Sequence, residues 1–260
     1  MTSPADNPEQ EGDLAEGTLL SHLVELRARL VRIAIAVGVV FLVLLPFSRR
    51  IFTMVAEPVT AALPGGAMIS TSPAAPVLTP LKLTFFVALF VAMPIVLHQV
   101  WAFVSPGLYR KEKRFAVPLL ASSILLFYAG IAFAYFVVFP LMFNFFTAAA
   151  PENVLVQTDI TQYLDFITTI VFAFGIAFEV PIATVLVVWT GMTTPEKLGK
   201  ARPYVFLMAF IIGMFLTPPD VISQTLLAVP VYLLYELGIF MARVFAPKAD
   251  AEADEGTSDG

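Results

Sequence analysis

Six long apolar segments, separated by shorter polar stretches, dominate the pattern of this chain. They lie at about residues 31–47, 81–104, 117–139, 166–189, 204–216 and 221–241. A helix of twenty residues rises about 30 Å, which is enough to cross the hydrocarbon core of a bilayer. The second, third and fourth segments reach that length. The first segment is marginal, but the helix that precedes it extends it, and the last two segments are short. The pattern predicts an all-α, polytopic membrane protein with six transmembrane helices.

The composition supports this prediction and excludes several kinds of chemistry. Hydrophobic residues make up 58% of the 260 residues and charged residues 13%, whereas a soluble domain is nearer half apolar and a quarter charged. Without cysteine, the chain offers no disulfide and no thiolate nucleophile. With two histidines and no HExxH pattern, we expect no metal and no other cofactor. Nothing in the charge pattern suggests a nucleic-acid partner.

Lysine and arginine are divided unequally between the two sides of the predicted bundle. If the N-terminus lies inside, about twelve of these residues near the segment ends share its side, and three lie on the other. The positive-inside rule then places both termini in the cytoplasm. Acidic stretches at 1–17 and 246–260 are predicted as disordered cytoplasmic tails around one membrane domain, 18–245. The outer segment 48–80 is long enough to form a cap.

Prolines recur within the apolar segments, and each removes a backbone hydrogen bond and bends its helix. They are Pro94, Pro118, Pro140, Pro181 and Pro230. Five bends in so small a bundle favour a curved wall over straight parallel rods.

The stretch "SHLVELRARL" (21–30) contains one carboxylate, Glu25, among several arginines. Leucines at helical spacing define one face, and Glu25 and Arg29 share another, which predicts an amphipathic helix at the cytoplasmic surface. The simplest interpretation of Glu25 is an ion pair with Arg29, four residues later. The alternative is a ligand site, because "YRKEKRF" (109–115) also places one acid, Glu112, in a basic field. Two such carboxylates would suit a ligand with two guanidinium groups.

Glu179, in "FGIAFEVP", lies near the middle of the fourth segment, where an acidic side chain is costly and is by default a candidate functional residue. Pro181 follows it and adds a helix bend. The alternative is a buried acid that hydrogen-bonds to a neighbouring helix. Trp101 is expected among the aromatic residues at the membrane interface.

Several longer stretches resemble the TatC family of twin-arginine protein translocase subunits. The similarity covers residues 19–244 and includes "HLVELRARL", "VWAFVSPGLYRKEKR", "FGIAFEVPIATVLV" and "FLTPPDVISQTLLAVP". The resemblance implies six membrane helices in a concave bundle. It also implies binding of twin-arginine signal peptides and export of folded proteins across the bacterial inner membrane. The expected partners are TatA- and TatB-type single-span subunits and further copies in a multimeric complex, with the protonmotive force as the energy source.

The same resemblance assigns roles to individual residues. It implies a signal-peptide site of Glu25, Arg27, Phe103, Leu108, Glu112 and Arg114. It also implies an intramembrane acid at Glu179 and outer-side assembly positions at Pro58, Asp220 and Gln224. The loop departs from many family members, which carry a histidine before the equivalent of Glu112.

Three other functions remain open from the residues alone. A small-solute or proton-coupled transporter would use Glu179 as its carrier, although no internal repeat is visible. An intramembrane protease would need a nucleophile and base or paired acids, and no such constellation or GxSxG motif is present. A structural membrane scaffold needs no site at all. We predict no enzymatic activity.

Overall fold

The structure is a computed structural model that describes residues 8–62, 68–104, 113–149, 158–217 and 220–245. In these ranges the regular elements are helices, apart from one parallel bridge between Ile69 and Asp159. The elements are α1 (Pro8–Leu44), η1 (Leu45–Phe47), α2 (Ser48–Ala62), α3 (Ala75–Val91), α4 (Met93–Val104), α6 (Lys113–Phe133), η2 (Ala134–Val138), α7 (Phe139–Ala149), α8 (Ile160–Ala177), α9 (Val180–Trp189), α10 (Pro195–Leu216) and α11 (Val221–Phe245).

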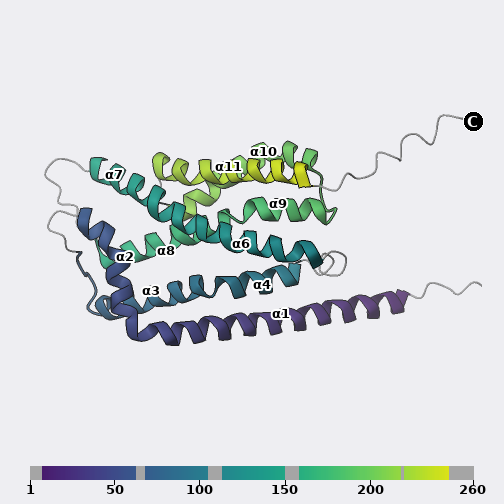
Figure 1. The fold of residues 1–260 in the computed structure, drawn as a ribbon, viewed down its shortest axis with the longest axis horizontal. Helices are drawn as coiled ribbons and strands as arrows, with labels where there is room; N and C mark the ends of the chain where they lie inside the picture. The colour runs from purple at the N-terminus through teal and green to yellow at the C-terminus, as the bar shows by residue number, and fades with distance from the viewer. Residues whose placement is uncertain (1–7, 63–67, 105–112, 150–157, 218–219, 246–260) are drawn as a thin grey trace, which may run out of the picture.

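The predicted membrane spans are present. Five helices of the described ranges are long and apolar enough to cross a bilayer, and the bent pair α3 and α4 supplies a sixth span. The N-terminal end of α1 and the C-terminal end of α11 lie at the same end of the bundle (Figure 1), as an even number of crossings requires. The all-α, six-span prediction is therefore confirmed.

The predicted surface helix around Glu25 is not a separate element. It is part of α1, which runs without a break from Pro8 to Leu44 and continues into the first span. No proline or glycine cluster interrupts the chain there, so helical hydrogen bonding continues from the polar surface into the membrane. α1 also begins inside the segment 1–17 that the sequence assigns to a tail, and the predicted tail 246–260 lies outside the described residues.

Two of the five prolines within spans coincide with helix breaks, and a third coincides with a π-helical turn. A 55° bend separates α3 from α4 just before Pro94. The backbone between α8 and α9 turns at Phe178 and Glu179, just before Pro181. The π-helical turn η2 ends beside Pro140. In each case the missing proline N–H removes a hydrogen bond to the preceding turn. Pro118 and Pro230 stay inside continuous helices.

The last two helices are longer than their apolar segments. α10 has 22 residues because it begins at Pro195, where the Thr194 side chain accepts from the Lys197 backbone N–H. α11 has 25 residues and includes Glu236. The sequence therefore predicts the apolar part of each helix, but not the polar first turns of α10 or the last four residues of α11.

Close helix packing organises the centre of the bundle. Phe127, Met142, Ile170 and Phe174 are almost completely buried there. α6 and α8 approach closely at Gly130, where an added Cβ would lie 2.5 Å from the Phe174 carbonyl oxygen. Small residues at such crossings are typical of membrane helix pairs. In Figure 1, α1 lies along one edge of the molecule, α3 and α4 beside it, and α10 and α11 at the opposite edge.

Asp159 joins two segments that the sequence predicts to lie on the outer side. Its Oδ2 accepts from the Thr71 backbone N–H at 2.9 Å and from the Thr71 hydroxyl at 2.8 Å. Its Oδ1 accepts from the backbone N–H groups of Thr161 and Gln162, which caps α8. These hydrogen bonds lower the pKa of the Asp159 carboxyl to about 2, with the Thr71 backbone N–H as the largest cause. We call this arrangement the outer clasp.

Candidate functional site at the end of α4

Glu25 and Arg29 form an ion pair on α1, as the simplest interpretation of the sequence predicts. The Nε and Nη2 atoms of Arg29 lie 3.0 Å and 2.5 Å from Glu25 Oε1. The Glu25 side chain is 48% exposed, whereas that of Arg29 is only 17% exposed. The carboxylate is thus at the surface, while the guanidinium is turned toward the protein.

The guanidinium of Arg29 also contacts the last turn of α4. Its Nη1 donates to the buried Gln99 side chain at 3.4 Å, and its Nη2 donates to the Ala102 carbonyl at 3.2 Å. The carbonyls in the last turn of a helix lack intrahelical partners and carry partial negative charge. Arg29 therefore joins α1 to the C-terminal end of α4.

The other residues of the predicted signal-peptide site lie on three different helices or outside the described residues. Arg27 is exposed on α1, and Phe103 is half-buried in the last turn of α4, next to Ala102. Arg114 belongs to the first turn of α6. Glu112 and Leu108 lie outside the described residues, so the predicted pairing of Glu25 with Glu112 stays a prediction.

Glu179 lies at the break between α8 and α9 and is bonded to a neighbouring helix. The Ser123 hydroxyl of α6 donates to Glu179 Oε2. Trp101 of α4 in turn donates its Nε1–H to the Ser123 hydroxyl at 2.8 Å. Glu179 Oε1 is buried without a hydrogen-bond partner among the described residues. Trp101, expected only as an interfacial aromatic residue, thus belongs to a hydrogen-bonded chain that ends on the intramembrane acid.

Of the predicted outer-side residues, Asp220 lies in the turn between α10 and α11, and Gln224 lies in the first turn of α11. Asp220 Oδ1 accepts from the Ser223 backbone N–H at 2.7 Å and so caps α11. Gln224 donates to the Phe210 carbonyl of α10 at 2.7 Å. Within the described ranges, Asp220 Oδ2 and Ser223 Oγ are buried without hydrogen-bond partners. Pro58 lies in α2.

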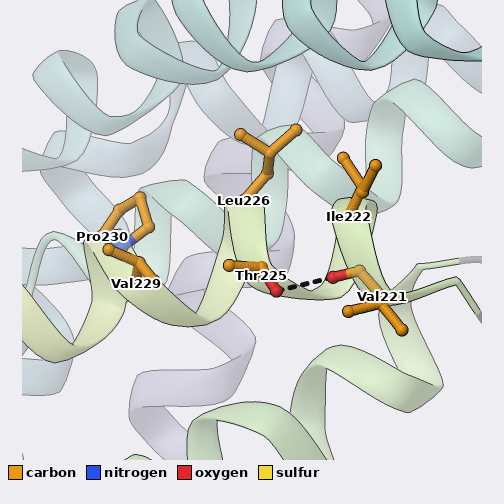
Figure 2. Close-up of a pocket in the computed structure, with 6 residues that line it drawn as sticks. All are labelled: Val221, Ile222, Thr225, Leu226, Val229 and Pro230. Atoms are coloured by element: carbon orange, nitrogen blue, oxygen red, sulfur yellow. Dashed lines mark hydrogen bonds between the residues drawn. The ribbon is translucent and has the colours of Figure 1, made fainter.

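An open apolar pocket follows directly along α11. Figure 2 shows its lining, in which the Thr225 hydroxyl is turned back to donate to the Val221 carbonyl at 2.6 Å. This bond satisfies the one hydroxyl of the lining inside its own helix, so the pocket presents an apolar surface. The lining residues are Val221, Ile222, Thr225, Leu226, Val229 and Pro230.

A second ion pair accounts for the acid in the last span. Arg202 Nε lies 2.7 Å from Glu236 Oε1, and its Nη2 donates to Oε2 at 2.8 Å. Tyr232 donates to Glu236 Oε1 at 2.9 Å. The pair fixes α10 against α11. Its partners are 34 positions apart, so no local spacing in the sequence indicates it.

Comparisons with known proteins agree with this architecture. Residues 21–230 match the family model "Sec-independent protein translocase protein (TatC)". A TatC of that name from Azotobacter chroococcum mcd 1 is 53% identical over 96% of this chain and 98% of its own length. The Escherichia coli K12 TatC is 54% identical over 88% of this chain and 90% of its own length.

A solved structure gives the same result in three dimensions. A crystal structure described as the twin arginine translocase receptor TatC superposes with a TM-score of 0.77 at 38% identity, and the match covers 86% of this chain and 98% of that one. Family model, relatives and fold agree over nearly all of the membrane domain. The chain belongs to the TatC family of Sec-independent protein translocase proteins, and it is a membrane-embedded protein transport component rather than an enzyme.

Proposed function

We propose that this chain is the receptor subunit of a twin-arginine translocation system. It binds signal peptides with paired arginines on the cytoplasmic side of the bacterial inner membrane. With TatA- and TatB-type partners and further copies of itself, it passes folded proteins outward at the expense of the protonmotive force. The description of a similar solved structure as a translocase receptor supports this proposal.

The observation that carries the proposal is the half-exposed carboxylate of Glu25. Its partner Arg29 contacts the end of α4, and Glu112 follows α4 by eight positions in the sequence. Two anionic side chains at one surface would each take one guanidinium, and the surrounding cations would disfavour any ligand without two correctly spaced forks. Phe103, Leu108, Arg27 and Arg114 would complete the site.

The partners are proposed from the membrane-facing surfaces of α10 and α11. The apolar pocket at the start of α11 suits the packing of a single apolar helix. Asp220 and Gln224 lie at the same end of α11. Polar contacts between helices strengthen association inside a bilayer. Pro58, Asp220 and Gln224 are the proposed assembly positions.

The proposed orientation has both termini in the cytoplasm. The unequal distribution of lysine and arginine supports it. The common position of the free ends of α1 and α11 in Figure 1 is consistent with it. The site at the end of α4 then faces the cytoplasm, and the outer clasp faces the opposite side.

Replacing Glu112 with Ala tests the proposed function directly. The variant should insert into the membrane normally, yet a peptide with paired arginines should no longer crosslink to it, because one guanidinium loses its carboxylate. Crosslinking in membranes that hold the full chain and its partners measures this. As a matched control, Glu57→Ala removes an exposed acid of α2 and should leave crosslinking unchanged. Crosslinking of Glu112→Ala at the level of the unaltered chain would contradict the proposal.

A further inference from the structure

Arg29 has more contacts than an ion pair within one helix requires. A pair at i and i+4 needs only one or two nitrogens, but all three guanidinium nitrogens of Arg29 donate to neighbours. Nε and Nη2 contact Glu25, Nη1 contacts Gln99, and Nη2 also contacts the Ala102 carbonyl. With its side chain 17% exposed, the guanidinium is set into the junction of α1 and α4.

The two bonds to Glu25 fall on the same oxygen. Both Nε and Nη2 donate to Oε1, which fills the acceptor positions of that atom. Across the part of the chain that the structure describes, Oε2 accepts no hydrogen bond. Because the Glu25 side chain is 48% exposed, Oε2 remains available to a donor from solution. Arg29 therefore occupies one oxygen of the carboxylate and leaves the other open.

We propose that Arg29 is the positioning residue of the signal-peptide site: it clamps Glu25 Oε1 to the end of α4 and so presents Oε2 to one guanidinium of the ligand. The inference rests on the proposed function and assigns different roles to two residues of the proposed site. Glu25 meets the ligand end-on through a single oxygen, and Arg29 acts only through Glu25.

Charge alone does not explain this arrangement. A lysine at position 29 would keep the positive charge near Glu25 and near the negative end of α4. Its single nitrogen is a compact donor on a flexible stem, so it lacks the planar fork that reaches Glu25, Gln99 and the Ala102 carbonyl together. If position matters more than charge, Arg29→Lys should behave as a loss of function.

The test compares binding of a labelled peptide with adjacent arginines to membranes that hold the full chain and its partners. A peptide with two lysines in their place gives the background. Arg29→Lys should weaken binding about tenfold, the cost of losing charge-assisted hydrogen bonds that orient an acceptor. The matched control is Arg32→Lys, an exposed arginine of the same helix, which should bind as the unaltered chain does.

A double substitution separates positioning from other effects. In a Glu25→Gln background, Arg29→Lys should cause no further loss, because Arg29 acts through the carboxylate. An equal loss in both backgrounds would overturn the inference, and so would unchanged or tighter binding by Arg29→Lys alone. Tighter binding would make Arg29 a competitor of the ligand. If Glu25→Gln alone leaves binding unchanged, the proposed function fails instead, whatever Arg29→Lys does.

Discussion

The two carboxylate oxygens of Glu25 differ in their hydrogen bonding in the same way as those of Glu179. In each, one oxygen accepts from an internal donor, Arg29 or Ser123, and the other has no hydrogen-bond partner among the described residues. An ion pair or a bond to a neighbouring helix therefore does not exclude a ligand role. The internal hydrogen bond fixes the carboxylate, and the second oxygen can still accept a hydrogen bond from a ligand. The two acids differ in exposure, since Glu25 is at the surface and Glu179 Oε1 is buried.

Glu179→Gln separates the charge of the intramembrane acid from its shape. The glutamine oxygen can still accept from Ser123, so the hydrogen-bonded chain from Trp101 should persist and the site at the end of α4 should keep its structure. Peptide binding should stay within about twofold of the unaltered chain, because no contact of Glu25 or Arg29 is removed. Export should fall by about tenfold or more, since an acid at that depth is retained for function. Parallel measurements of peptide crosslinking and of exported cargo decide the outcome.

Loss of crosslinking by Glu179→Gln would contradict this division and place the residue in the primary binding site. A matched control is Asp165→Asn, which neutralises a half-exposed acid of α8 that pairs with Lys82. It tests whether any neutralised carboxylate in that span reduces export.

Sequence patterns predict which residues matter more reliably than they predict what those residues touch. Glu25 and Glu179 stand out because acids are rare in and near apolar segments. Gln99, Ala102, Ser123 and Trp101 do not stand out, because their roles arise only when α4 and α6 pack beside α1 and α8. Arg29 and Ala102 are 73 positions apart, so no local spacing indicates their contact.

Among the helices, a proline has different consequences at different positions. The sequence predicts a bend at every proline inside a span, but breaks occur beside Pro94 and Pro181, and a π-helical turn ends beside Pro140. Pro118 is the sixth residue of α6, beyond the first turn, and also leaves its helix continuous. Pro230 lies in the middle of α11 and leaves the helix continuous. We have no physical account of that continuity. The sequence predicts where bends can occur, while packing decides which become breaks.

The crossing of α6 and α8 offers a sharp test of element packing. At Gly130, a methyl group would lie 2.5 Å from the backbone oxygen of Phe174, which cannot move aside as a flexible side chain can. Gly130→Ala should therefore lower the free energy of unfolding by about 1–3 kcal/mol, the usual cost of overpacking. Thermal unfolding in detergent, followed by tryptophan fluorescence, measures the change.

Gly38 supplies the control for that experiment. It also lies inside a helix, α1, but an added Cβ would meet no atom within 4 Å. Gly38→Ala should be neutral or slightly stabilising, because alanine is favoured over glycine in helices. Equal effects of the two substitutions would show that the close approach of α6 and α8 does not limit stability.

At the scale of the whole molecule, the two ends of the bundle are held by different means. At the end of α4, a guanidinium joins helices that are far apart in sequence. At the opposite end, Asp159 joins the segment after α2 to the start of α8. The sequence predicts that residues 48–80 can form a cap, but not its attachment, because the partners Thr71 and Asp159 lie 88 positions apart.

Asp159→Ala should loosen this outer attachment in a pH-dependent way. The pKa of Asp159 is lowered to about 2 in the folded protein, so its charged form is stabilised by folding. The contribution to stability is complete above the ordinary value of 3.8 and is lost as the pH falls toward 2. The unaltered chain should therefore be more stable than the variant at pH 7, and the difference should shrink below about pH 4.

Asp159→Asn should lie between the unaltered chain and Asp159→Ala in stability, because asparagine can still cap α8. Thermal unfolding of all three from pH 7 to 3 measures the differences, in which the titration of other acids cancels. A difference that stays constant over this range would mean that the carboxylate charge contributes nothing to the outer clasp.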